Sequence, residues 1–474
     1  MVYSGQAIRN ATKIFLPQIR RRIYGEDFPR FGPLAQYFRS SRLVFPFRWQ
    51  FFDTAKMAES VAVAGVEKFS IKHYIVTAVA AMVLFASGGT FGQTPVRAPA
   101  NPQFKFSTPI APGVAVPDKL ESSIGTLNLN YGYPSADTVE KIYDNLDRSR
   151  ALQAYLLAIP IVNQAGMRDS IRKFGPDNQT DVIWEDLVDP RTVELTANDN
   201  TIYNFIWVDT SKGPLVAEIP PKVLGLVNDF WYKWVADVGI TGADKGEGGK
   251  YLLLPPGYKG DIPSGYHVVR PSTFGNWLVF RAFLVDGSTR PGVDSVKKNL
   301  RIYSLADAAN PPPMKFVNAS GVPANFVAPG DYSFWSLLNQ VIQEEPTAGS
   351  DPTTLGLFAS IGIVKGQPFN PDERMKKILT DAANIGAVTA RAIAFKIRSK
   401  EAYFYPDSAW RLPFFGGYKF EVSPGVSNLD GAAFYYYFAT GVTPAMEEKM
   451  VGQGSQYPWL VQDAKGNPFD GGKN

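Results

Sequence analysis

Residues 195–209 read LTANDNTIYNFIWVD and open a run of short apolar segments that continues to residue 287. Alternating apolar and polar residues over four to eight positions are typical of strands that bury one face. Turn sequences rich in Gly and Pro separate the segments, which favours an antiparallel sheet or sandwich. The predicted strands are Thr201–Val208, Leu215–Ile219, Phe230–Val238, Tyr251–Leu254, Tyr266–Val269 and Trp277–Val285.

Helical patterns flank this strand region on both sides. The spacing of Asp137 and Glu140 is typical of a helix-capping box, and an apolar stripe follows it until Pro160, which is expected to end or bend the helix. After the strands, we predict helices at Tyr332–Ile342, Leu355–Ile361 and Asp372–Ile397. Aromatic strands, including Phe434–Phe438, are expected after Lys400. The fold class is therefore mainly β with helical insertions (α+β).

The net charge of +4 is concentrated in residues 1–56, which carry +7 and leave −3 on the rest of the chain. A slightly acidic body lacks the basic surface that phosphate backbones require, so we expect no nucleic-acid partner. We interpret residues 1–56 as a basic extension that is disordered or not native, because Met57 offers a second start. The sequence does not decide whether the natural protein starts at Met1 or at Met57.

Residues 57–92 have the pattern of an export signal. Lys68 and Lys72 precede the apolar stretch Tyr74–Ala86, which is too short to span a bilayer but suits a signal peptide. An uncleaved anchor and a buried helix are the alternatives. A Pro-rich linker, 93–115, follows. We expect a periplasmic or secreted protein that touches a membrane only through an uncleaved signal.

Spaced motifs carry a resemblance to a known family. In order they are Thr196–Tyr203, Asp209, Ser211–Pro214, Glu218–Pro220, Gly248–Tyr251, Pro255–Gly260 and Arg281–Gly287. Together they resemble the bacterial family called domain of unknown function 1254. Phe334–Asn339, Ile361–Phe369 and Leu429–Gly431 are similar to the link to its partner, domain of unknown function 1214. The resemblance implies two β-rich domains, the second similar to a jelly roll, and relatives that are oligomeric and often exported. It implies no catalytic residue.

With this resemblance, residues 116–310 form the first domain, 326–400 a helical connection, and 401–474 a truncated start of the second domain. The chain departs from the family pattern at Asn200, where relatives tend to have a carboxylate, while Asp199 stands one place earlier. Neighbouring side chains of a strand point to opposite faces of the sheet, so on a strand Asp199 would lie on the face opposite to that of Asn200. The second domain also stops early, which predicts either a fragment or a sheet edge covered by another chain.

Residue types that usually announce a reaction are scarce. There is no Cys, and His73 and His267 are the only histidines, so thiolate and multi-histidine metal sites are excluded. No Gly-x-Ser-x-Gly motif accompanies His267, which we interpret as a strand residue, with a base or a metal ligand as alternatives. Gly242–Lys250 lacks the Ser or Thr of a phosphate loop and is interpreted as a hairpin loop. We predict no cofactor and no metal.

The favoured hypothesis is an exported, homo-oligomeric binding or structural protein with a small-molecule or carbohydrate ligand. Aromatic residues without a nucleophile–base pair are typical of contact surfaces. The predicted ligand-binding residues are Asn198, Asp199, Asn200, Tyr203, Trp207, Trp231 and Trp234. The alternative is a cofactor-free hydrolase of esters, amides or glycosides that uses carboxylates of residues 199–237 or His267. Its weak catalytic candidates are Asp199, Asp209 and His267, with Asp229 and Asp237 as further acids.

Overall fold

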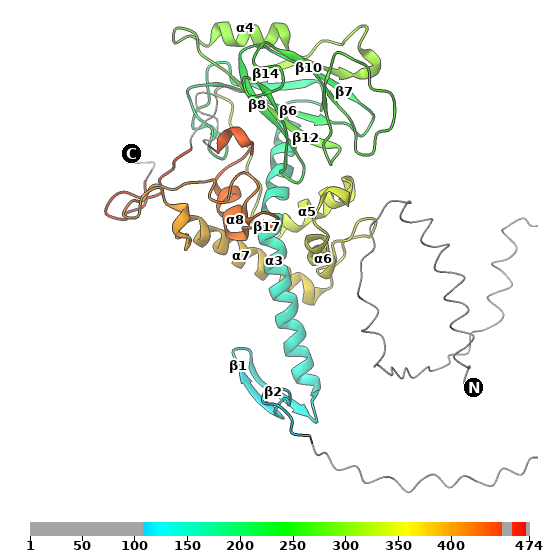
Figure 1. The fold of residues 1–474 in the computed structure, drawn as a ribbon, viewed down its shortest axis with the longest axis vertical. Coiled ribbons are helices and arrows are strands. Elements are labelled where there is room, and N and C mark those ends of the chain that lie inside the picture. The colour runs from blue at the N-terminus through cyan, green and yellow to red at the C-terminus, as the bar shows by residue number, and fades with distance from the viewer. Residues whose placement is uncertain (1–107, 448–456, 471–474) are drawn as a thin grey trace, which may run out of the picture. The chain divides into compact units, whose positions relative to one another are not determined.

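The computed structural model describes residues 108–447 and 457–470 of the 474-residue chain. The predicted basic extension, the signal segment with His73, and residues 93–107 of the predicted linker lie outside the described residues. Strands and helices alternate in blocks, so the fold is α+β and rich in β-structure, as predicted (Figure 1).

A six-stranded sheet forms the centre of the strand region, in the order β14-β4-β6-β12-β8-β9. Its strands are β4 (Thr180–Ile183), β6 (Ile202–Asp209), β8 (Val223–Asp229), β9 (Trp234–Gly239), β12 (Gly275–Ala282) and β14 (Lys315–Asn318). Strand β12 pairs antiparallel with both β6 and β8, with Trp277 opposite Trp207. The sheet is mixed because β14 runs parallel to β4.

A four-stranded sheet packs on one face of the first sheet, in the order β11-β10-β7-β13. Its strands are β7 (Leu215–Ile219), β10 (Gly249–Leu253), β11 (His267–Val269) and β13 (Arg301–Ser304). Alternate residues of β6, such as Ile206 and Val208, join Ala217 and Leu253 in one apolar cluster, which we call the sandwich core. Helix α4 (Arg290–Asn299) adds Val293 and Val296 to it. The predicted sandwich is thus present.

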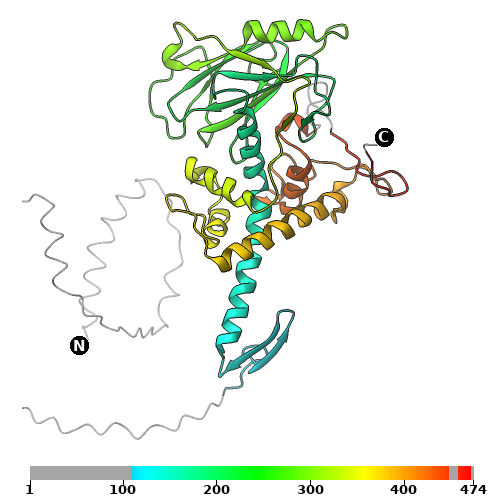
Figure 2. The ribbon, with the colours of Figure 1, turned by 180° about the vertical axis from the view of Figure 1, so that it is seen from behind.

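On the other side of the six-stranded sheet lies a group of helices, of which the first contacts β6 and the others pack on that first helix. They are α3 (Ala136–Ile171), α5 (Ser333–Glu344), α6 (Pro352–Ser360), α7 (Glu373–Phe395) and α8 (Leu429–Phe438). Phe205, Trp207 and Trp277 point to this side and join Tyr155 and Trp335 in a second cluster, the helix-side core. Helix α3 contacts α5, α6, α7 and α8 (Figures 1 and 2). The predicted helices at 332–342, 355–361 and 372–397 are confirmed by α5, α6 and α7.

By length and composition alone, α7 is apolar enough to cross a membrane. In this structure one of its faces packs on α3 and α8 and buries Ile378, Leu379 and Ala383. An amphipathic helix in a layered α+β fold buries one of its faces against neighbouring elements in the same way.

Helix α3 differs from the prediction at its cap, and of the two outcomes expected at Pro160 the structure excludes an end of the helix. The cap is Ser135, whose hydroxyl accepts from the N–H of Thr138, while Asp137 lies in the first turn. The helix continues through Pro160 to Ile171, because the buried residues of its second half hold it in the helix-side core. Before it lies a three-stranded antiparallel sheet of β1 (Lys119–Ser122), β2 (Gly125–Asn130) and β3 (Tyr133–Pro134).

The region predicted as one strand, Phe230–Val238, contains a turn. Strand β8 ends at Asp229, and its carboxylate accepts from the N–H groups of Trp231 and Lys233 at 3.0 and 2.9 Å. Tyr232 has a positive φ of 59°, which breaks the extended backbone. The chain then re-enters the same sheet as β9.

The C-terminal segment also differs from the prediction. Phe434–Phe438, expected as an aromatic strand, belongs to helix α8, whose cap Asn428 accepts from the N–H of Gly431. Among the described residues of 401–474, the strands are the short pair β16 (Glu421–Ser423) and β17 (Val426–Ser427). A further short pair, β5 (Thr192–Val193) with β15 (Ala324–Asn325), lies upstream.

Candidate functional site

A cavity of about 90 Å³ lies on the helix-side face of the six-stranded sheet, over β6, β8 and β12. Its floor is apolar and consists mainly of Phe205, Leu226, Trp277 and Val279. Polar residues from five separate stretches of chain surround this floor. They are Glu194, Thr196, Tyr203, Thr241, Arg281, Thr440, Thr443 and Tyr457. An apolar floor with a few polar groups at the rim is the usual composition of a small-molecule site.

One wall of the cavity is the segment after α8, which the sheet holds through paired hydrogen bonds. The side chain of Asn228 on β8 accepts from the N–H of Val442 and donates to its carbonyl, both at 2.9 Å. The hydroxyl of Thr443 donates to Asp237 on β9 at 2.5 Å. The N–H of Gly441 donates to the hydroxyl of Tyr232 at 3.1 Å. The wall is therefore fixed to two neighbouring strands.

Glu194 supplies the acid of the cavity. Although the residue is partly exposed, both its carboxylate oxygens are buried, and neither has a side-chain hydrogen-bond partner among the described residues. Burial raises the pKa of Glu194 to about 8, against a smaller opposing effect of the Leu195 N–H. At neutral pH the carboxyl group is mainly protonated, so it can donate a hydrogen bond into the cavity.

Other buried polar atoms at the cavity lack partners too. Within the described part of the chain, no group accepts from the indole N–H of Trp277 or bonds to the hydroxyl of Thr440. Buried polar groups in folded proteins almost always have a hydrogen-bond partner, which is protein or ordered water. These atoms all belong to residues that line one cavity, which makes the cavity the candidate site.

Arg281 supplies the cation. It lies on β12 directly opposite Tyr203 on β6, and its guanidinium is 6.0 Å from the centre of the Tyr203 ring. Its Nη2 donates to the hydroxyl of Tyr457 at 3.4 Å. No carboxylate of the described ranges lies within ion-pair distance of Arg281. Burial raises the pKa of Tyr203, and the charge of Arg281 opposes this.

The predicted amide-rich motif lies beside this cavity. Asn198 donates to the hydroxyl of Tyr203 at 3.1 Å and accepts from the N–H of Asn200 and the hydroxyl of Thr201. Asp199 and Asn200 are exposed in a bend, not on a strand, because this Asn198 turn keeps the backbone out of the sheet until β6 begins. The strand-based expectation of opposite faces for Asp199 and Asn200 is therefore wrong.

The three tryptophans predicted to bind ligand lie elsewhere. Trp207 is 1% exposed and packs edge-on against Phe230 in the helix-side core. Trp231 is also buried there. Trp234 is exposed at the start of β9, and its indole N–H donates to Asp237 at 2.9 Å. None of the three lines the cavity, because their side chains stabilise the core and the wall.

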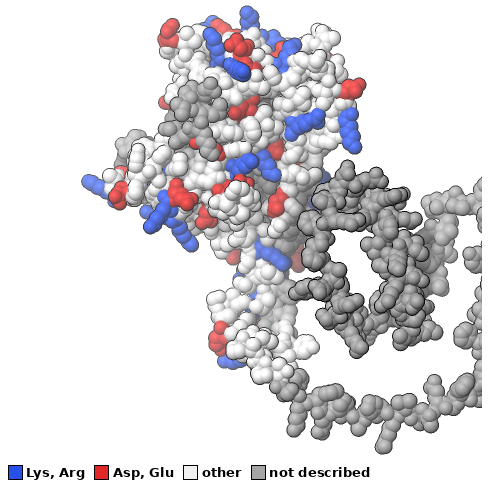
Figure 3. All heavy atoms as spheres, viewed as in Figure 1, with Lys and Arg blue, Asp and Glu red and all other residues white. Residues whose placement is uncertain are grey.

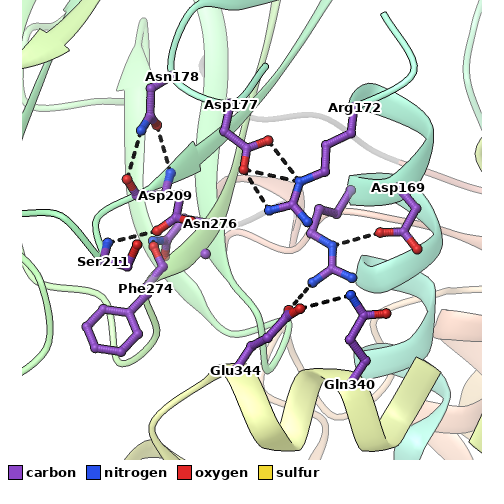
Figure 4. Close-up of polar contacts among 12 residues, drawn as sticks. Asp169, Arg172, Asp177, Asn178, Asp209, Ser211, Phe274, Asn276, Gln340 and Glu344 are labelled. Atoms are coloured by element: carbon purple, nitrogen blue, oxygen red, sulfur yellow. Dashed lines mark hydrogen bonds and ion pairs between the residues drawn. The ribbon is translucent and has the colours of Figure 1, made fainter. Parts of the chain in front are cut away.

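The weak catalytic candidates are not gathered in one place. Asp199 is exposed in the bend, whereas His267 lies on β11 in the four-stranded sheet, with its ring centre 5.0 Å from that of Tyr251. Asp209 ends β6, where its carboxylate accepts from the N–H of Ser211 and its backbone exchanges two hydrogen bonds with Asn178 (Figure 4).

The two remaining acids have structural partners. Asp229 accepts from the turn that ends β8 and from the hydroxyl of Ser272. Asp237 accepts from Trp234 and Thr443. Burial raises the pKa of both acids, while these hydrogen bonds lower it. Across residues 108–447 and 457–470, no group of three or more His, Asp or Glu side chains is placed to hold a metal ion.

Sequence reasoning named Trp277 among the aromatic residues that could stack on a ligand, but it missed Glu194 and Arg281 as site residues. A signal for Arg281 was present: it continues the alternation of Trp277 and Val279, so it falls on the apolar face of β12. A charged residue on a buried face is an unusual placement that asks for a partner. Glu194 lay in a stretch with no clear period, and the wall at 440–446 is far away in sequence, so neither had a comparable signal.

The fold and the cavity thus define an α+β protein with a candidate small-molecule site. Residues 179–304 match the family model described as "Protein of unknown function (DUF1254)", which confirms that part of the resemblance. The VPA0106 protein from Vibrio parahaemolyticus has a solved structure similar to this chain, with 16% sequence identity and a TM-score of 0.43. The match covers 69% of this chain and 74% of that chain. No curated protein matches the sequence significantly.

Proposed function

We propose that the chain is a binding protein that holds a small, largely apolar molecule in the cavity over β6, β8 and β12. The observation that carries the proposal is the gathering of unpartnered buried polar atoms from Glu194, Trp277 and Thr440 around this cavity. A bound molecule with hydrogen-bonding groups would satisfy them, which stabilises the folded protein. The size and the apolar floor favour a small molecule over a carbohydrate.

Thermal unfolding in the presence of hexanoate, hexanamide or hexylamine tests this proposal. At least one probe is expected to raise the Tm of the native protein, because a ligand that binds only the folded state stabilises it. Leu226→Phe narrows the cavity floor and is expected to abolish the shift. Val268→Phe, on the exposed side of β11, is the matched control and is expected to retain it. Equal shifts in both variants would contradict the proposal.

We also propose that the protein is exported and that it assembles into a homo-oligomer. Three aromatic side chains at and beside the β1–β3 sheet are largely exposed: Tyr131 (92%), Tyr133 (78%) and Tyr143 (58%). Their exposure supports assembly into a homo-oligomer. Light scattering after size-exclusion chromatography measures the oligomeric mass, and a monomer would contradict assembly. N-terminal sequencing of the natural product tests the signal at 57–92 and the choice between Met1 and Met57.

We make two further proposals, of which the first rests on sequence motifs and the second on the distribution of charge. We propose that residues 401–474 begin a domain related to domain of unknown function 1214. We also propose no nucleic-acid partner; acidic and basic side chains are interspersed on the face shown in Figure 3, which supports this. The hydrolase alternative is tested by screening esters, amides and glycosides beside the variants Asp199→Ala and His267→Ala.

A further inference from the structure

We propose that the ligand of this cavity is a short-chain carboxylate, whose anionic group pairs with Arg281 and whose apolar chain lies on Trp277, Leu226 and Val279. This inference rests on the proposed function and specifies the class of ligand. Three features of the cavity carry it: a cation without a carboxylate partner, an acid that burial keeps neutral, and an apolar floor between them.

Arg281 is the first feature. The residue is partly buried on the apolar face of β12, and its contacts in the described structure are the Tyr203 ring and a long hydrogen bond to Tyr457. A guanidinium has five N–H donors, so most of its hydrogen-bonding capacity is free for a ligand. Withdrawing a cation from water is costly unless an anion compensates it. A planar carboxylate matches this guanidinium through two parallel hydrogen bonds.

The second feature is the protonation state of Glu194. An ionised carboxylate in the same cavity would repel an anionic ligand, whereas a protonated carboxyl group donates a hydrogen bond to it. The neighbouring ionisable groups are Tyr203 and Arg281 from the sheet, Tyr457 from the C-terminal segment, and Tyr232 and Asp237 behind the wall. Arg281 is the cation of this set. Among the described residues that line the cavity, Glu194 is the acid and Arg281 is the cation, so the protonated form of Glu194 leaves the charge of Arg281 uncompensated within the lining, which suits a monoanion.

The third feature is the surface on which the rest of the ligand lies. Trp277, Leu226 and Val279 are each at most 7% exposed and form a continuous apolar floor. Each methylene group buried there adds to affinity, whereas a second charge would be left without a partner. A dicarboxylate or a phosphate dianion fits this arrangement less well than a monocarboxylate with an alkyl chain.

The charge of the ligand is tested by calorimetry with butanoate and hexanoate against butanamide and hexylamine. The carboxylates are expected to bind about ten to a hundred times more tightly than the amide and the amine. Arg281→Gln removes this preference, and Arg281→Lys restores part of it, because lysine keeps the charge but loses the paired geometry. Arg290→Gln changes the net charge equally at an exposed helix end and is expected to have no effect.

The role of Glu194 is tested by the pH dependence of hexanoate binding. Affinity is expected to fall as the pH rises through about 8, where Glu194 ionises, and Glu194→Gln is expected to give a flat profile. A native profile that is already flat, or one that Glu194→Gln leaves unchanged, would overturn this part. Circular dichroism of each variant confirms folding, and Arg281→Lys serves if Arg281→Gln does not fold.

The outcomes separate the inference from the proposed function. If butanamide binds as tightly as butanoate and Arg281→Gln changes neither affinity, the cavity binds ligand without a preference for carboxylates, and only the inference fails. If no probe of any charge binds, both the proposed function and the inference fail. Tighter binding of hexylamine would assign the cavity to a cationic ligand held by Glu194 and would also overturn the inference.

Discussion

Protonation of Glu194 is coupled to folding. Its pKa is raised from 4.5 to about 8 in the folded protein, so the folded state holds a proton that the unfolded chain releases. The stability that this group contributes is therefore full below about pH 4.5 and falls as the pH rises towards 8. The cause is burial of the carboxylate oxygens at the cavity without a side-chain partner.

We predict that Glu194→Gln makes the protein more stable than the native chain as the pH rises from 5 to 8. Glutamine has nearly the same shape but never ionises, so the difference in the free energy of unfolding is small at low pH and grows to a few kcal/mol, at about 1.4 kcal/mol for each pKa unit. Urea unfolding at several pH values measures it. A difference independent of pH would show that Glu194 is not the titrating group.

Asn228 fixes the cavity wall to the sheet. Replacing it with Ala leaves the buried N–H and carbonyl of Val442 without partners, so we predict a loss of about 2 kcal/mol or more in the free energy of unfolding. Asn200→Ala is the matched control, since Asn200 is exposed, and its effect is expected to stay below about 0.5 kcal/mol. Urea titration compares them, and equal losses would contradict the role of Asn228.

At the residue scale, the sequence predicted part of the candidate site. Asn198 and Tyr203 were found because their motif is distinctive, and they do lie together beside the cavity. Trp207 and Trp231 were expected at a contact surface but are core residues, because aromatic residues look alike in sequence whether they serve a core or a surface. Glu194 needs the three-dimensional structure, since only burial makes it unusual.

Helices α3 and α7 approach closely where Gly386 meets Tyr155. A Cβ at Gly386 would overlap the ring of Tyr155, so there is no space for a side chain. We predict that Gly386→Ala destabilises the protein by about 1–3 kcal/mol through overpacking. Gly356→Ala on α6 has open space around it and should instead stabilise by about 0.5–1 kcal/mol. Thermal unfolding of the two variants should shift in opposite directions.

Among the helices and strands, predictions held where residue type and flanking turns agreed. Strand β6 is a short run rich in β-branched and aromatic residues that turn sequences bound, and it was predicted almost to the residue. Helix α8 was predicted as a strand because Phe434–Phe438 is apolar throughout and shows neither the helical nor the strand periodicity of apolar residues. The cap at Asn428 was the available helix signal. The turn after β8 was missed because Trp231 and Tyr232 look like strand residues.

The whole described body is organised around the six-stranded sheet, because the sandwich core and the helix-side core lie on its two faces. Loss of packing in either core would expose one face of these strands and so weaken the sheet on which the other core packs. We predict a single cooperative unfolding transition for this body. Tryptophan fluorescence, which reports mainly on the helix-side core, and far-ultraviolet circular dichroism should give coincident urea curves. Separated midpoints would show that the two cores unfold independently.

The wall at residues 440–446 is synthesised after the strands that form the cavity floor. The floor strands β6, β8 and β12 leave the ribosome well before the segment that covers them, and a chain grows by about 5–20 residues per second. For several seconds each nascent molecule has an apolar floor without its wall. A small molecule present during that interval can be enclosed as the wall docks, so that the chain folds around the ligand and the ligand need not enter a finished cavity.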